Sequence, residues 1–118
     1  MIDITESVSS FVGDEQIKEG LVVVYVPHTT AGVTINEGAD PAVAQDVIGQ
    51  FSELAPAGKN YLHAEGNSDG HIKAGLTGSS VVIPVSSGKL ALGTWQAVFF
   101  CEFDGPRHRR TVIKFIKT

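Results

Sequence analysis

The chain has 118 residues, of which 42% are hydrophobic and 19% charged, and its formal net charge is −4 at pH 7. This length and composition are typical of one folded domain, so we expect residues 1–118 to form a single domain and exclude a disordered chain. The negative charge disfavours sequence-independent binding of nucleic acid. No apolar run approaches the roughly 20 residues of a membrane-spanning helix, and the N-terminus does not resemble a secretory signal, so we expect a cytoplasmic protein without a membrane partner.

The first part of the chain predicts one helix and two strands. Residues 5–12 predict a short helix that ends at Gly13. Residues 21–26 are mostly β-branched and apolar on both faces, so we expect a strand that other elements cover on both sides. Residues 32–37 predict a second short strand.

The middle of the chain predicts two helices. Asp40-Pro41 is typical of a helix N-cap followed by the first helical position. In residues 41–54 the apolar side chains recur three and four positions apart, so one face of this helix is expected to pack on the sheet. After a loop, residues 68–77 predict another helix, which Asn67 or Ser68 would cap.

The last third predicts strands joined by short turns. The expected strands are residues 80–85, 90–92, 94–103 and 107–116. Because Asp104-Gly105-Pro106 is a tight turn, we expect the last two strands to be antiparallel neighbours. The predicted fold class is therefore α+β: a compact, twisted, mainly antiparallel β-sheet or sandwich with two or three short helices.

The single cysteine and a basic segment each allow a structural and a functional interpretation. Cys101 shares an alternating apolar face with Trp95 and Phe99, so we expect a buried thiol in preference to a nucleophile. Arg107-His108-Arg109-Arg110 is expected either to form a charged edge strand that resists aggregation or to attract a small anion.

Three histidines lie in contexts that are typical of a binding site. His28 follows the apolar strand, and strand ends often display binding groups. His63 and His71 bracket a polar loop. Three neutral imidazoles can hold a zinc-type ion with one open position, and the alternative is a hydrogen-bonded polar pocket without metal. Four carboxylates are candidates for orienting these rings or acting as a general base: Glu37, Asp40, Glu65 and Asp69.

The start of the predicted helix near Asn67 is a candidate phosphate site. Free N–H groups and the helix dipole favour an anion there, while Lys73 and Arg107 would add charged donors. An ordinary capped helix with a solvated lysine is an equal alternative. Gln96 and Glu102 share one face of the long predicted strand, where exposure to solvent would explain them as well.

Six separated segments carry a family resemblance. They are Pro27-His28-Thr29-Thr30-Ala31-Gly32, Thr34-Ile35-Asn36-Glu37 with Ala39-Asp40-Pro41, His63 with Glu65-Gly66-Asn67-Ser68, His71-Ile72-Lys73-Ala74, Leu92-Gly93-Thr94-Trp95-Gln96 and Glu102-Phe103-Asp104-Gly105-Pro106-Arg107. In order and spacing they strongly resemble the YjbQ-like family, also described as secondary thiamine-phosphate synthases. The resemblance covers nearly the whole chain.

This resemblance implies a compact α+β fold with a twisted antiparallel sheet, usually assembled as a homotrimer. It also implies an activity that joins a pyrimidine diphosphate to a thiazole phosphate and releases pyrophosphate. A divalent ion, zinc or magnesium, and basic side chains would stabilise the leaving group, a role that suits Lys73, Arg107 and Arg109. The implied catalytic residues are His28, Glu37, His63 and His71, with the three histidines as metal ligands. The implied substrate-binding residues are Asn36, Asn67, Lys73, Gln96, Glu102 and Arg107.

One departure from the family concerns the N-terminus, where members commonly carry a strand before residue 2, and its lack is expected to affect assembly. The function that we expect is a small metal-assisted transferase-like enzyme of the secondary thiamine-phosphate synthase type, acting on phosphorylated heterocycles. Two alternatives stay open. One is a non-catalytic module that binds a phosphorylated metabolite or a metal, and the other is a hydrolase that uses a metal-bound water.

Overall fold

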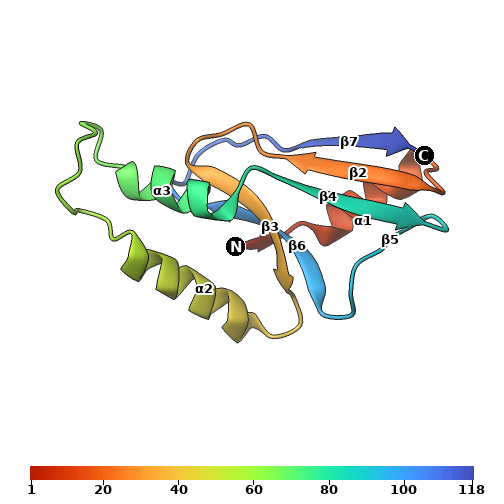
Figure 1. The fold of residues 1–118 in the computed structure, drawn as a ribbon, viewed down its shortest axis with the longest axis horizontal. Coiled ribbons are helices and arrows are strands. Elements are labelled where there is room, and N and C mark those ends of the chain that lie inside the picture. Colours follow the sequence, from red (N-terminus) through yellow and green to blue (C-terminus); the bar gives the residue numbers. More distant parts are fainter.

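The computed structural model describes all residues from Met1 to Thr118 (Figure 1). It contains three helices and seven strands, which confirms the α+β class. The helices are α1 (Thr5–Asp14), α2 (Pro41–Leu54) and α3 (Ser68–Thr77). The strands are β1 (Ile2–Asp3), β2 (Gly20–Tyr25), β3 (Ala31–Glu37), β4 (Ser80–Ser86), β5 (Lys89–Leu90), β6 (Gln96–Glu102) and β7 (Val112–Lys117). Strand β1 is not predicted from the sequence. No helix is both long enough and apolar enough to cross a membrane.

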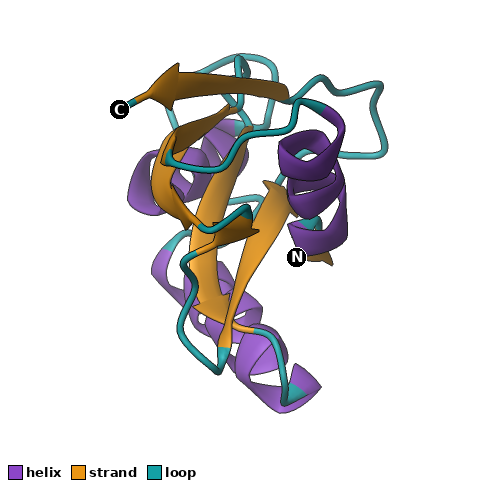
Figure 2. Ribbon diagram, turned by 90° about the vertical axis from the view of Figure 1, so that its right-hand side faces the viewer, coloured by secondary structure: helices purple, strands orange, loops and turns teal.

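The strands form two antiparallel sheets, one in the order β1-β6-β3 and one in the order β5-β4-β2-β7. Figure 2 shows the strands in orange and the helices in purple. In the larger sheet β2 lies between β4 and β7, so that Val22 pairs with Ile83 on one side and Phe115 on the other. In the smaller sheet β6 is central and pairs with β3 from Ala31 opposite Glu102 onward. Nearly all the ladder bonds therefore join residues that are distant along the chain.

The predicted hairpin between the last two strands is wrong. Strand β6 belongs to the smaller sheet and β7 to the larger one, and residues 107–111 form an irregular crossover between them. The arginines of this segment are held by side-chain bonds: Arg107 Nη2 lies 2.9 Å from Asp104 Oδ2, and Arg109 Nε lies 2.7 Å from Glu102 Oε1. Residues 107–111 are therefore held by side-chain ion pairs and not by the backbone hydrogen bonds of the expected edge strand.

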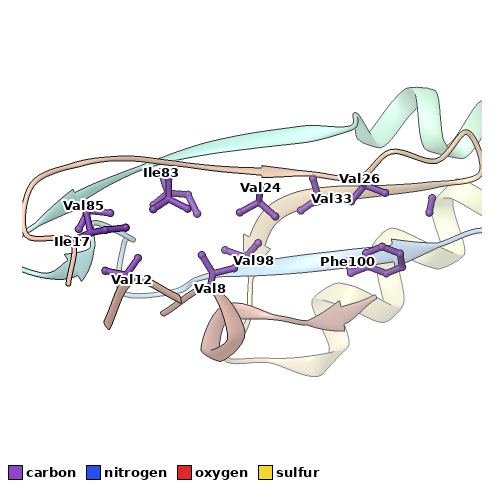
Figure 3. Packing of buried hydrophobic residues seen from close by; sticks show 12 residues of the cluster. Val8, Val12, Ile17, Val24, Val26, Val33, Ile83, Val85, Val98 and Phe100 are labelled. Carbon is purple, nitrogen blue, oxygen red and sulfur yellow. The ribbon is translucent and has the colours of Figure 1, made fainter. Parts of the chain in front are cut away.

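The main core lies between the larger sheet and a layer formed by α1 and β6 (Figure 3). Val8 and Val12 of α1 point toward Val24 and Ile83 of the sheet, and all four are almost completely buried. Four residues is about one helical turn, while alternate residues of a strand share a face, so each element presents one apolar row. Burying each such side chain stabilises the fold by roughly 1.5–3 kcal/mol. Helix α1 continues through Gly13 to Asp14, two residues beyond its predicted last residue, Val12.

The outer face of the larger sheet is left uncovered by the chain. Tyr25, Val82 and Ile116 are exposed there, and Leu21 and Val23 are half-buried. Within one chain, the predicted cover of β2 is therefore present on one of its two faces only. Its apolar character is a feature that the core does not explain.

Helix α2 begins as predicted but packs loosely. Asp40 Oδ1 accepts a hydrogen bond from the Ala42 N–H at 2.9 Å, and Pro41 is the first helical residue. None of its residues is fully buried, although the ring of Phe51 lies 6.1 Å from that of Phe103. The predicted packing of α2 on the sheet is therefore limited to a partly exposed contact.

The prediction for Cys101 is confirmed, because the thiol is buried and its burial raises the pKa to about 11. It lies in a small second cluster with Ala97 and Phe99, on the face of β6 that points away from the main core. Trp95 does not share this buried face, since it precedes β6 and is exposed.

The close contact between Gly32 and Gly78 provides a test of this packing. A Cβ atom at Gly32 would lie 2.5 Å from the Gly78 carbonyl oxygen, which already accepts the Val33 N–H. We expect Gly32→Ala to lower the free energy of unfolding by about 1–3 kcal/mol, because backbone must move. In the matched control Gly49→Ala, the new Cβ meets nothing within 4 Å and should raise stability by roughly 0.5–1 kcal/mol. Urea unfolding measures both, and similar changes in the two variants would contradict the contact.

Candidate functional site

A polar pocket of about 730 Å³ opens where β2 ends, beside α3. Its wall comes from the segment that follows β2, the loop before α3, the first turn of α3 and the crossover between β6 and β7. The lining residues are Tyr25, Val26, Pro27, His28, Thr29, Thr30, His63, Glu65, Asn67, His71, Ser79, Asp104, Arg107 and Arg109. Because most of these side chains are polar or charged, the pocket suits a hydrophilic ligand.

The fold places His28, His63 and His71 on the wall of this one pocket. His28 lies after β2, His63 lies in the loop before α3, and His71 lies in the first turn of α3. The rings of His63 and His71 meet edge to face, with their centroids 5.4 Å apart. His63 Nε2 also lies 3.8 Å from Glu65 Oε2. Three elements that are distant in sequence thus contribute imidazoles to a common space.

His28 is held by the backbone of the crossover. Its Nε2 accepts a hydrogen bond from the Arg110 N–H at 2.9 Å. This bond ties the segment after β2 to the residues that lead into β7. Since β2 and β7 also pair along their whole length, the position of the His28 ring is set by the sheet itself.

Arg109 clamps the pocket wall to β6. Its guanidinium donates hydrogen bonds to both carboxylate oxygens of Glu102 and to the Thr30 hydroxyl, which lies 2.8 Å from Nη2. The Arg109 side chain is only 12% exposed. The hydrogen bonding between Arg109 and Glu102 is the main cause that lowers the pKa of Glu102 and raises the pKa of Arg109. With its donors engaged in this way, Arg109 supports the pocket more than it offers a free charge to a ligand.

Asp104 joins the start of α3 to Arg107. Asn67 Nδ2 and Arg107 Nη2 both donate to Asp104 Oδ2, each at 2.9 Å, and the bond from Asn67 is the main cause that lowers the pKa of Asp104. Asn67 therefore does not cap α3 with its side chain as predicted. The Arg107 side chain is 54% exposed, so Arg107 is the most accessible positive charge on the wall.

The other predicted site residues lie elsewhere. Asn36 and Glu37 are at the far end of β3, where Glu37 Oε2 accepts the Asp40 N–H at 3.1 Å in a groove beside α2. Gln96 accepts the Gly93 N–H at 2.8 Å at the start of β6.

Lys73 and Glu102 face a second, smaller cavity under α2, which measures about 370 Å³. Lys73 is paired with Asp69 at 3.1 Å there. Glu102 reaches the main pocket only through Arg109. The sequence reasoning also missed Thr30, a buried hydroxyl whose signal was its place two residues after His28.

No group of three His, Cys, Asp or Glu side chains is positioned to hold a metal ion in this structure. The 5.4 Å spacing of the His63 and His71 rings does match two imidazole ligands of one ion, for which roughly 5 Å is expected from metal–nitrogen bonds near 2 Å. His28 could join them only by releasing Arg110, because its Nε2 already accepts that N–H. Ring spacing is therefore compatible with a shared ion for two of the three rings.

The pocket combines features that favour an anion. Arg107 supplies a charged fork, His63 and His71 supply imidazoles, and the first turn of α3 brings the positive end of a helix dipole to the wall. This concentration of positive groups is local to the pocket, since the chain as a whole carries a net charge of −4.

Comparison with known proteins gives consistent matches over the whole chain. The family model described as "UPF0047 protein YjbQ-like" matches residues 1–118. A UPF0047 protein of Methanocaldococcus jannaschii is 52% identical over 116 residues, which is 98% of this chain and 84% of the relative. The UPF0047 protein YugU of Bacillus subtilis is 47% identical over 98% of this chain and 89% of its own length.

Solved structures give the same result. A crystal structure of a YjbQ/UPF0047 protein from Clostridium acetobutylicum superposes with a TM-score of 0.95 at 50% identity, covering 98% of this chain and 89% of that one. A protein from Aeropyrum pernix K1 superposes with a TM-score of 0.94 at 39% identity, covering 99% of this chain and 88% of that one. These matches establish a family and a fold, and no substrate comes with them.

The clamp between Arg109 and Glu102 predicts a dependence of stability on pH. Because pairing lowers the pKa of Glu102 below its ordinary value of 4.5, Glu102 stabilises the fold above that pH and the contribution is lost as the pH falls through the lowered pKa. We expect Glu102→Gln to cost about 1–2 kcal/mol at neutral pH. The variant should also lose less unfolding free energy than the wild type between about pH 6 and pH 3. Urea unfolding at both values measures this, with the exposed Glu53→Gln as control. A wild-type pH dependence in Glu102→Gln would contradict the clamp.

Proposed function

This chain belongs to the UPF0047 YjbQ-like family, and we propose that it is a small transferase-like enzyme of the secondary thiamine-phosphate synthase type, acting on phosphorylated heterocycles. The observation that carries the proposal is the meeting of three imidazoles and the accessible Arg107 in one polar pocket. Its compartment would be the cytoplasm, where the single cysteine stays reduced.

The size and charge of the pocket support a phosphorylated ligand. A volume of about 730 Å³ lies within the range of roughly 300–1,000 Å³ that small-molecule sites occupy. Arginine is suited to phosphate because its planar fork can make two parallel hydrogen bonds to phosphate oxygens. Arg107 has one partner carboxylate, Asp104, and more than half of its side chain is open to solvent.

In the proposed reaction, the carbon–oxygen bond to the diphosphate breaks and its electron pair leaves with pyrophosphate. A ring nitrogen of the thiazole phosphate uses its lone pair to form the new bond to the same carbon as the leaving group departs. Arg107 would hold the departing oxygens, and His63 and His71 would donate hydrogen bonds to the charge that develops on them. Lys73 and Glu37 take no part here, because both lie outside the pocket.

The proposal includes a divalent ion, zinc or magnesium, at His63 and His71. Their ring spacing supports this pair as ligands. Such an ion would supply further neutralisation of the pyrophosphate charge. His28 belongs to the ligand set only if its bond to Arg110 breaks.

We also propose that the uncovered face of the larger sheet is buried in a homotrimer. Leu21, Val23, Val82 and Ile116 form an apolar patch across three adjacent strands, and the exposed Lys114, which pairs with Val23, lies at its edge on β7. With strands about 4.8 Å apart and a rise near 3.3 Å per residue, the patch spans a few hundred Å², a size that marks interaction sites. Tyr25 lies both on this face and in the pocket wall, so a second copy seated here would also enclose the pocket.

Activity is tested by incubating purified protein with both thiamine precursors and a divalent ion. We expect thiamine phosphate and pyrophosphate to form, and we expect a chelator to lower the rate. Arg107→Ala should reduce turnover by about a hundredfold or more, because a donor to the developing charge is lost. Arg110→Ala is the matched control, since that arginine's side chain does not line the pocket.

Absence of product above the level of a His71→Ala variant would reject the synthase assignment. Saturable binding without turnover would favour the non-catalytic module. Hydrolysis of the diphosphate without coupling to the thiazole would favour the hydrolase.

Light scattering measures the oligomeric state of the protein and of variants on the uncovered sheet face. Val82 and Leu76 are each 54% exposed, but Leu76 lies on α3, away from the larger sheet. We expect Val82→Asp to convert the homotrimer into monomer, because a charge would be buried at the contact. The control Leu76→Asp should stay trimeric. A wild-type protein that is monomeric at micromolar concentration would reject the proposal.

A further inference from the structure

We propose that the backbone N–H of Arg110 fixes His28 as the neutral, Nδ1-protonated tautomer, so that His28 serves the pocket as a hydrogen-bond donor to an anionic oxygen of the ligand. The same bond would prevent His28 from acting as a general base or a metal ligand. The inference rests on the proposed function in one respect, which is that this pocket is the ligand site.

The first step concerns the chemistry of the bond. A backbone N–H can only donate, so the atom that faces it must present a lone pair. His28 Nε2 lies 2.9 Å from Arg110 N, an ordinary length for a hydrogen bond. Nε2 therefore carries no proton, and the single proton of the neutral ring is on Nδ1.

The second step is that the position of the Arg110 N–H is fixed on both sides. Before it in the chain, Arg109 is bonded to Glu102 and Thr30. After it, Val112 pairs with Tyr25 at the start of β7. The donor is thus held by the ion pair and by the sheet ladder, and it cannot turn away to suit another tautomer without disturbing both.

The third step concerns the free side of the ring. His28 Nδ1 makes no hydrogen bond to the protein. It is also not one of the fully buried polar atoms that lack a partner, so Nδ1 is open to solvent. His28 lines the same pocket as Arg107, His63 and His71. Its Nδ1–H is therefore an unused donor on an accessible wall, and a phosphate or carboxylate oxygen is the complementary group.

The fourth step separates the roles of the three imidazoles. A neutral imidazole has one lone pair, and that of His28 is already used. Taking a proton or an ion there requires the bond to Arg110 to break. His63 and His71 carry no such bond to the backbone, so any proton transfer or metal binding falls to them, and His28 selects for ligands that accept a hydrogen bond.

The tautomer is read directly from the wild-type protein. Long-range ¹H–¹⁵N correlation spectra of protein with ¹⁵N-labelled histidine, free of ligand and metal at neutral pH, distinguish the protonated ring nitrogen from the bare one. The His28 signals are assigned by their loss in His28→Asn. We expect a single tautomer with the proton on Nδ1. A proton on Nε2, or a mixture of both tautomers, would overturn the inference whatever the activity of the protein.

The donor role is tested by calorimetry with inorganic phosphate and pyrophosphate as probes. His28→Asn retains a donor near the position of Nδ1, whereas His28→Ala removes it. We expect His28→Asn to bind within about threefold of the wild type and His28→Ala to bind about tenfold or more weakly, the effect of one hydrogen bond to a charged group. Equal losses in the two variants would overturn the donor role.

A backbone variant tests the cause. Arg110→Pro removes the N–H that fixes the ring, while Arg110→Ala keeps it. We expect weaker phosphate binding in Arg110→Pro alone. Equal affinity in a folded Arg110→Pro would overturn the proposed cause, and if that variant does not fold, the spectra and the His28 variants decide. Should wild-type protein bind neither probe while Nδ1 carries the proton, the ligand role and the proposed function both fail, whereas the tautomer assignment stands.

Discussion

The ion pair between Arg109 and Glu102 is the contact on which the pocket depends, because it holds the last of the crossovers by which the chain passes from one sheet to the other. Glu102 is the last residue of β6 in the smaller sheet, and Arg109 lies in the crossover that leads to β7 in the larger sheet. A third group, the Thr30 hydroxyl, brings the segment after β2 into the same contact. Ordering an irregular segment costs roughly 1–2 kcal/mol of backbone entropy per residue, and this mostly buried clamp offsets part of that cost.

The pocket follows from this clamp. Once Arg109 is held, Arg107 on one side reaches Asp104 and the start of α3, and the backbone of Arg110 on the other side reaches His28. The charges inside the wall are largely satisfied by partners in the protein, which leaves Arg107 and the imidazoles as the groups that face the open volume. A pocket built in this way is preorganised, since its donors need little rearrangement when charge arrives.

Two apolar surfaces lie outside the core, because one chain has too few elements to cover both the outer face of the larger sheet and helix α2. Strand β2 is rich in valine on both of its faces, but α1 and the smaller sheet cover only one of them. The loosely packed α2 and the uncovered sheet face leave apolar side chains in water at a cost of about 25 cal/mol per Å². Association of copies would remove that cost, and Tyr25 would couple such an assembly to the pocket.

The sequence by itself determined the local elements and the residues that carry chemistry. Asp40-Pro41 marked the start of α2, β-branched runs marked β2 and β4, and the contexts of His28, His63 and His71 selected three residues that line one pocket. These signals act between neighbours in the chain, through capping, φ restriction and side-chain periodicity.

Tertiary structure alone decided which strands pair and which polar residues meet. The turn at residues 104–106 was compatible with a hairpin, yet Arg109 bonded to Glu102 and Thr30 sends β7 to the other sheet. The same register carried Glu37 and Gln96 away from the pocket and brought in Thr30. Such contacts join residues as far as 82 positions apart, as in the bond between Arg110 and His28, and no local propensity records whether they form.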